Sequence, residues 1–388
     1  MKNVLMVSYY SPPYAGVSVV RVKKYCKYLP EYNWQPWVFT VDPRYYAGKI
    51  VDDLEDIRNT KTIRIPYYKV PGKVFLVKLF FPFLVAAFSL KNKSKLKAVY
   101  LTGSPFHPFL LTVFLTGIFR IPTILDFRDS WSFNHGFDGR NAGSLKEKIS
   151  EVFIGSIEKL SIKFASKVTF STHILHEEYS NRYSEYRHKF KTITNGYDPD
   201  DFISVKPRKV VNTKSIILTG KFKIYTPEVV YGIFEAVKAL NNFTFIYVGG
   251  ESEELIELAK EYGIENKIVS LPYMPYSDSL DLIAGADYAM MTNGMVNGTG
   301  TKIFDYLALK KPVICFVPEG SIISHQFSDI DHIVIKEGPH TNDSILDGLE
   351  KLFSIKTAPS ENAIKEYSRI YASQDLAKIL NEIIAMNP

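Results

Sequence analysis

The chain has 388 residues, a hydrophobic fraction of 46% and a formal net charge of +6. This length exceeds what one hydrophobic core usually supports, and the composition excludes an intrinsically disordered protein. The two cysteines, Cys26 and Cys315, fit no metal or redox spacing and indicate a reducing compartment. We therefore expect a cytosolic protein of two domains.

The charge is divided unevenly along the chain. Residues 1–200 carry 29 Lys and Arg against 17 Asp and Glu, a balance of +12. The remaining residues carry 18 against 24, a balance of −6. No Asp or Glu lies between Asp56 and Asp126, where eleven Lys and Arg occur. Such an acid-free stretch predicts an anionic partner, either a nucleic acid or a membrane.

The first residues alternate between apolar runs and a loop. We predict a buried strand at 4–7, a glycine-containing loop at 8–16, a helix at 19–29 and a second strand at 37–41. This order is typical of the start of a doubly wound α/β domain. Because the loop does not read Gly-x-Gly-x-x-Gly, we do not expect an ordinary dehydrogenase.

Residues 73–91 form an apolar, aromatic-rich run with basic flanks. Lys78 and Pro82 interrupt the run, and it is short for a membrane span. Its composition favours a helix that lies in the headgroup region of an anionic leaflet, with residues 73–97 as the contact. The alternative is a buried core helix, the interpretation that we prefer for residues 109–119.

Charged side chains follow a buried strand predicted at 122–126. Ligands of open α/β sheets bind where the strands end, so Asp126, Arg128 and Asp129 are candidate catalytic residues. Another buried strand is predicted at 98–102. His107 follows it at the same edge and is a fourth candidate. A lone histidine is more often structural than catalytic.

The second half of the chain repeats the α/β alternation after a polar linker. Strands are predicted at 215–219, 243–248, 268–271, 286–291 and 313–317, and helices at 228–240, 253–262, 277–284 and 362–385.

Residues 297–317 are the most informative stretch. The small residues 298–301 let the backbone approach a ligand closely, and they lead into a helix whose first N–H groups favour an anion. Lys302 adds a positive charge, and Asp305 can accept hydrogen bonds from sugar hydroxyls. A diphosphate with a ribose attached fits such a site. The alternative is a capped helix start with nothing bound.

Four motifs stand out, at residues 8–16, 126–131, 195–198 and 300–308. In this order and spacing they resemble the family 4 retaining glycosyltransferases of the GT-B fold, across nearly the whole chain. The resemblance implies an α/β fold of two Rossmann-like doubly wound domains facing across a cleft. The acceptor would bind to residues 1–205 and the nucleotide sugar to residues 206–361, and a helix at 362–388 would cross back to the first domain.

The resemblance also implies a donor site and no bound metal or cofactor, because helix N-termini and basic side chains neutralise the diphosphate. Asn297 and Asp305 stand where the family has two glutamates, and lysines replace the usual arginine and lysine pair. The implied donor-binding residues are Gly16, Lys221, Lys223, Gly249, Gly250, Tyr273, Met274, Asn297, Gly298, Thr299, Gly300, Thr301, Lys302 and Asp305.

The sequence therefore predicts a retaining glycosyltransferase that uses a nucleotide-diphosphate sugar, with UDP favoured, and a lipid-linked or membrane-proximal glycan acceptor. We expect it in the cytoplasm, peripherally attached to the inner face of the cell membrane. Nucleic acid is not an expected partner, because the basic residues lie beside apolar runs. Two alternatives are a GT-B nucleotide-sugar epimerase and a non-catalytic nucleotide-sugar-binding scaffold, the latter suggested by Asn297.

Overall fold

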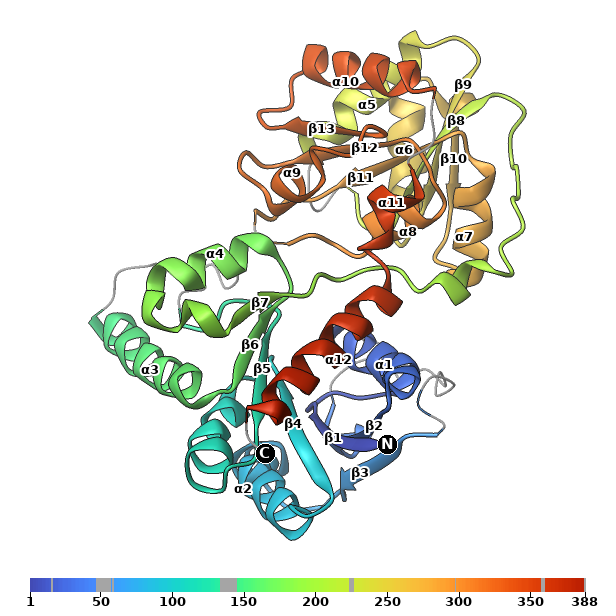
Figure 1. Cartoon of the computed structure of the whole chain (residues 1–388). Helices are drawn as coiled ribbons and strands as arrows, with labels where there is room; N and C mark the ends of the chain where they lie inside the picture. Colours follow the sequence, from blue (N-terminus) through green and yellow to red (C-terminus); the bar gives the residue numbers. More distant parts are fainter. Residues whose placement is uncertain are drawn as a thin grey trace. The chain divides into compact units, whose positions relative to one another are not determined.

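The computed structural model describes residues 1–14, 17–46, 57, 59–132, 145–222, 227–296, 298–356 and 360–386. The chain divides into two compact units, one of Met1–Asn195 with Arg369–Pro388 and one of Gly196–Ser368. The first crossing between units thus precedes the boundary predicted at residue 205, and the second follows that predicted at residue 361. Each unit is built on a parallel sheet (Figure 1).

Within the described residues, the sheet of the first unit has seven parallel strands in the order β3-β2-β1-β4-β5-β6-β7. The chain adds strands outward from β1 to β3 and then returns to β1's other side with β4, which makes β1/β4 the switch point of the sheet. The strands are β1 (Lys2–Val7), β2 (Trp34–Val41), β3 (Lys61–Ile65), β4 (Leu96–Thr102), β5 (Thr123–Phe127), β6 (Lys167–Phe170) and β7 (Phe190–Thr192).

Helices cover both faces of this sheet. Successive side chains of β1 point to opposite faces, so Val4 packs in one buried cluster and Leu5 in another. The first cluster includes residues of α1 and α12, and the second includes residues of α2. The helical segments are α1 (Val17–Tyr28), η1 (Leu29–Tyr32), η2 (Pro43–Tyr45), α2 (Lys73–Lys91), η4 (His107–Leu110), the π-helix η5 (Val113–Ile118), α3 (Leu145–Phe164), α4 (His173–Arg182), η6 (Ser184–Lys189) and α12 (Arg369–Ala385).

The described part of the second unit contains a six-stranded parallel sheet in the order β10-β9-β8-β11-β12-β13, with its switch point between β8 and β11. Its strands are β8 (Lys214–Thr219), β9 (Phe243–Val248), β10 (Ile268–Leu271), β11 (Tyr288–Thr292), β12 (Val313–Val317) and β13 (Ile333–Glu337). Its helical segments are η7 (Pro199–Phe202), α5 (Pro227–Ala239), α6 (Ser252–Glu261), η8 (Glu265–Lys267), α7 (Tyr276–Gly285), α8 (Lys302–Ala308), α9 (Ile322–Phe327), α10 (Asn342–Ser354) and α11 (Glu361–Lys365).

Two predicted helices differ from the structure. The helix predicted at 362–385 is divided into α11 and α12, because the backbone at Tyr367 and Ser368 pairs with Tyr197. The core helix predicted at 109–119 is instead a 3-10 turn followed by the π-helix η5. Phe114 and Ile118 on η5 are 46% and 61% exposed, so that segment is only partly in the core.

Helix α2 has one buried stripe and a large exposed apolar face. Val77, Phe81 and Val85 recur every fourth residue and pack in the core. Phe75 and Phe83, by contrast, are 68% and 67% exposed. Among the described helices α2 is the one long and apolar enough to cross a membrane, a property that core helices of soluble proteins share, but only 22% of its apolar window is buried. Hence α2 is not an ordinary core helix.

Candidate functional site

A cavity of about 570 Å³ lies in the second unit, where the strands on either side of the switch point end. It brings together seven of the residues that the sequence predicted to bind the donor: Lys221, Gly249, Gly250, Tyr273, Met274, Lys302 and Asp305. The lining residues that sequence reasoning missed are Thr219, Gly220, Val248, Glu251, Tyr276, Ser279 and Ile283. The volume is in the range of pockets that enclose a small ligand, about 300–1,000 Å³.

Lys302 reaches into this cavity from the first turn of α8, and its ammonium group donates a hydrogen bond to the carbonyl of Thr219. Burial lowers the pKa of Lys302 to about 8, and the nearby Asp305 carboxylate opposes this shift. A buried cation with few anionic neighbours gains most from a bound anion. Lys302 is thus suited to a phosphate group.

Gly220 makes room for that lysine. It follows β8 with a φ of 99°, a left-handed conformation that other residues rarely adopt. A Cβ atom at this position would coincide with the Lys302 ammonium group. In the sequence, this role of Gly220 could have been recognised from its position directly after the buried run Ile-Ile-Leu-Thr.

The loop that follows β9 supports the loop that follows β8. The hydroxyl of Tyr247 donates to the carbonyl of Gly220, and the Glu251 carboxylate accepts a 2.9 Å bond from the backbone of Phe222. A Cβ atom on Gly249 would collide with both the Tyr247 hydroxyl and the Gly220 carbonyl. Close packing of these two loops therefore requires a glycine at residue 249.

Asp305 and Tyr276 meet at the cavity. The Tyr276 hydroxyl donates a 2.7 Å hydrogen bond to the Asp305 carboxylate, although the two residues come from different helices. Burial, and then the Asp305 charge, raises the pKa of Tyr276. A ligand hydroxyl could therefore reach Asp305 only by replacing Tyr276 or by binding beside it.

The glycine-rich loop before α8 does not line the cavity. The residues predicted there, Gly298, Thr299, Gly300 and Thr301, are not among its lining residues. Asn293 instead holds the loop by donating to the Gly298 carbonyl, and Thr301 makes no side-chain cap on α8. Gly16, Lys223 and Asn297 lie outside the described residues.

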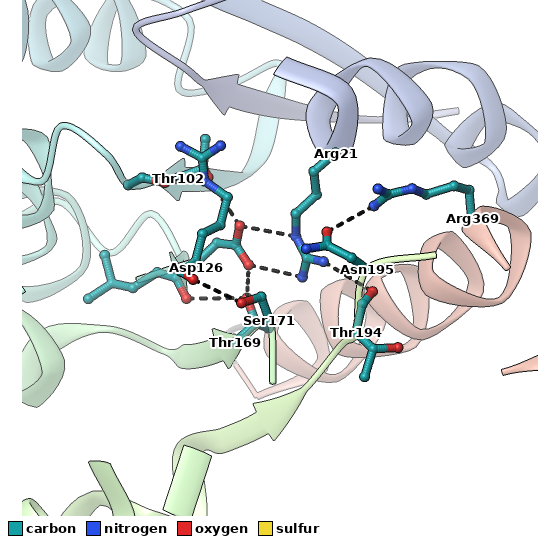
Figure 2. Close-up of polar contacts among 11 residues, drawn as sticks. Arg21, Thr102, Asp126, Thr169, Ser171, Thr194, Asn195 and Arg369 are labelled. Carbon is teal, nitrogen blue, oxygen red and sulfur yellow. Dashed lines mark hydrogen bonds and ion pairs between the residues drawn. The ribbon is translucent and has the colours of Figure 1, made fainter. Parts of the chain in front are cut away.

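In the first unit, Asp126 is an interior residue. Its side chain is fully buried, and Arg21 donates to both carboxylate oxygens at 3.1 and 3.2 Å (Figure 2). The hydroxyls of Thr102 and Thr169 also donate to it, at 3.1 and 2.8 Å. Its hydrogen-bonding capacity is used within the core, which favours a structural role. The catalytic role of Asp126 stays a prediction from the sequence.

Arg21 extends this network toward the end of the first unit. Its guanidinium donates a 3.2 Å bond to the carbonyl of Thr194, and Arg369 donates a 3.1 Å bond to the side chain of Asn195 (Figure 2). The network therefore fixes the chain just before its crossing at residue 195 and just after its return at residue 369.

Arg128 and Asp129 lie at the end of β5, as predicted. Arg128 is half-buried and donates to the carbonyls of Gly103 and Ser104, whereas Asp129 is exposed. Surrounding protein raises the pKa of the Asp129 carboxyl, and the Arg128 charge opposes this shift. Asp129 is therefore the acidic side chain of this motif that a ligand can reach.

His107 lines a groove beside α2. Its ring contacts the rings of Tyr9 and Phe81 at centroid distances of 6.4 and 6.2 Å. Burial, and then the Lys78 charge, lowers the pKa of His107 to about 4, so its imidazole is neutral at physiological pH. The prediction of a catalytic role is not supported by this packing.

Among the residues that the structure describes, no group of three or more His, Cys, Asp or Glu side chains is arranged to hold a metal ion. Metal independence nevertheless stays a prediction from the sequence.

Residues 202–370, almost entirely within the second unit, match the family described as "Glycosyl transferases group 1". The match spans less than half of the chain. No curated protein matches the chain in sequence.

Solved structures share the fold over the whole length. A glycosyltransferase from Rickettsia africae ESF-5 is 17% identical with a TM-score of 0.69, covering 100% of this chain and 99% of its own. Anabaena HepE in complex with UDP and glucose is 15% identical with a TM-score of 0.65, covering 98% and 100%. The lipopolysaccharide outer core galactosyltransferase WaaB is 11% identical with a TM-score of 0.62, covering 98% and 99%. These likenesses confirm the predicted GT-B fold.

Proposed function

We propose that this protein is a retaining glycosyltransferase that moves a sugar from a UDP sugar to a lipid-linked or membrane-proximal glycan. The proposal rests mainly on one observation. Lys221, Lys302 and Asp305, which the sequence predicted to bind the donor, line one cavity together with Gly220, Gly249 and Gly250. The family match at residues 202–370 and the UDP complex of HepE add support.

In this proposal the cavity holds the nucleotide diphosphate. Lys302 and Lys221 bind the two phosphates, and Asp305 accepts hydrogen bonds from the ribose hydroxyls. Tyr273 and Met274 contribute apolar surface for the base. Two cations beside the diphosphate offset the negative charge that collects on it as the glycosidic bond breaks, which is the main catalytic need of such a transfer.

In this proposal the first unit binds the acceptor. Asp129 orients the acceptor hydroxyl, because its exposed carboxylate ends a strand at the ligand-binding edge of the sheet. Arg128 positions Asp129 and adds positive charge beside it. Asp126 and Arg21 act through the fold, by fixing β5, the strand that leads directly into Arg128 and Asp129.

Attachment to the cytosolic face of an anionic membrane is also part of the proposal. The exposed apolar face of α2 is followed by exposed Lys91, Lys93, Lys95 and Lys97. Each basic residue near an anionic surface contributes ~1 kcal/mol, so four of them with inserted aromatics support reversible binding.

Sedimentation with vesicles tests this attachment. The protein should sediment with anionic vesicles at low salt and be partly released at high salt, because salt screens the lysines but not the inserted rings. Replacing Phe80 and Phe83 by Ser should remove the salt-resistant fraction. A wild-type protein that ignores anionic vesicles at low salt would favour a soluble acceptor.

A donor panel tests the function itself. Thermal-shift and calorimetric titrations with UDP, GDP, dTDP and ADP sugars should show stabilisation by one nucleotide class, because a ligand that binds only the folded state raises the melting temperature. The Lys302→Met variant should lose most of that shift. Donor turnover without any acceptor would favour the epimerase, and binding without turnover on any acceptor would favour the scaffold.

A further inference from the structure

A groove of about 590 Å³ lies in the first unit between α2 and the segment of η4 and η5. Leu79 and Phe83 of α2 form one wall, and Leu111 and Phe114 form the other. Apart from Lys78 and His107, its lining residues are apolar, and they are Phe75, Leu79, Pro82, Phe83, Ala86, Leu110, Leu111, Phe114 and Phe119. The groove therefore selects an apolar ligand.

The geometry points to a lipid phosphate as the occupant: we propose that the groove holds one hydrocarbon chain of such a lipid and that Lys78 binds its phosphate. This inference rests on the proposed function, because it names the lipid part of the acceptor.

The charges at the groove favour an anionic headgroup. Lys78 is an exposed cation among apolar neighbours, and no carboxylate is present among the lining residues that the structure describes. No Asp or Glu occurs in the sequence from residue 57 to residue 125, which includes both walls. An anion at Lys78 therefore meets no acidic side chain from either wall.

The polarity of the groove favours a hydrocarbon chain over an extended peptide. A peptide backbone brings N–H and C=O groups, which cost free energy when they are buried without partners. The walls offer few such partners, and His107 is neutral and packed against Tyr9 and Phe81. A hydrocarbon chain has no polar group, so its burial between the apolar walls leaves no hydrogen-bond donor or acceptor unpaired.

The local backbone makes the groove. The π-helix η5 leaves Phe114 exposed, and Gly117 lets the same segment approach Phe164 of α3 closely. Single π-helical turns are frequent at functional sites. Both walls present large apolar side chains to solvent, which is costly without a ligand.

Calorimetry with dodecyl phosphate, kept below its micelle concentration, tests the proposal on the full chain. Wild type should bind it saturably, and Leu79→Ser or Phe114→Ser should weaken binding by about tenfold or more through lost apolar contact. Leu84→Ser is the matched control: Leu84 is 43% exposed on the same helix and Leu79 is 49% exposed, but Leu84 does not line the groove. The control should keep wild-type affinity.

A second comparison tests the headgroup. Lys78→Gln should weaken dodecyl phosphate binding but leave binding of the uncharged dodecyl maltoside unchanged. Equal loss in Leu79→Ser and Leu84→Ser, or no saturable binding by wild type, would overturn the proposal. So would self-association of the protein that Leu79→Ser abolishes, because a second copy would then fill the groove.

UDP-glucose titrated into the same samples separates this inference from the proposed function. Lipid binding without UDP-sugar binding would refute the glycosyltransferase but leave the groove assignment. UDP-sugar binding without lipid binding would refute the groove assignment alone. Wild-type UDP-glucose affinity in the Leu79→Ser and Phe114→Ser variants would also show that they are folded.

Discussion

The pKa of Lys302 makes donor binding dependent on pH. Its buried ammonium group has a pKa of about 8 in the free protein. A bound diphosphate stabilises the charged form, so the complex holds this proton to a higher pH. Binding above pH 8 must therefore take up a proton, and affinity should fall as the pH rises.

The magnitude follows from the fraction of Lys302 that is charged. With a pKa of about 8, roughly 90% of the free protein carries the proton at pH 7 and roughly 10% at pH 9. If only the charged form binds well, the affinity for UDP-glucose should fall about tenfold between these pH values. A nucleotide sugar is the better ligand here, because its diphosphate does not titrate in this range.

Isothermal titration calorimetry at pH 7, 8 and 9 measures this effect directly, and buffers of different ionisation enthalpy report the proton uptake. Uridine, which has no phosphate, corrects for titration of the base. The Lys302→Met variant should bind UDP-glucose weakly. The pH dependence that remains after the uridine correction should be absent in this variant. An affinity that stays constant from pH 7 to 9, or a pH dependence that survives in Lys302→Met, would refute the reasoning.

Three further predictions concern single side chains. Asp129→Asn should lower turnover by about 10²-fold or more without changing donor affinity; near-normal steady-state rates would leave Asp129 a structural residue. Gly220→Ala should weaken UDP-glucose binding in calorimetry, because its Cβ displaces the Lys302 ammonium group and strains the backbone; unchanged affinity would exclude that lysine from the site. Arg21→Met should lower the free energy of unfolding of the first unit by about 3–5 kcal/mol in urea titrations, because Asp126 stays buried without its ion partner. Additional replacement of Asp126 by Leu should recover much of that loss, and no recovery would contradict the explanation.

The sequence was sufficient to predict the strands that have a clear local pattern of apolar and turn residues. The predicted strands 243–248, 268–271 and 313–317 match β9, β10 and β12, because their apolar runs end at turn residues. The edge strand β3 was missed, since its sequence Lys-Thr-Ile-Arg-Ile is mixed and mostly half-buried.

Residues whose roles depend on distant partners were not predictable. Asp126 pairs with Arg21, which lies 105 positions away in the sequence, and no local sequence pattern predicts this ion pair. His107 packs against Tyr9 and Phe81 in the α2 groove, and the residues around it in the sequence do not predict these contacts. The place of Tyr276 in the cavity was not predicted for the same reason, because its partner Asp305 is on another helix.

The donor cavity was predictable to a greater extent. Lys302, Asp305 and Lys221 were chosen for their chemistry, and the switch point of a parallel sheet brings their loops together. The loop 298–301 was chosen for its small residues, but its backbone packs toward Asn293 rather than lining the cavity.

The return of the chain to its first unit has a consequence for biosynthesis. The sheet face that carries Val4 is covered in part by Leu376, Leu380 and Ile383 of α12, which the ribosome makes only after the whole second unit. At typical translation rates this apolar surface stays uncovered for a time on the order of tens of seconds, while the whole second unit is being made. A nascent chain of this kind needs protection from aggregation. A gene fragment that ends at residue 195 therefore encodes an unfinished unit, not an independent domain.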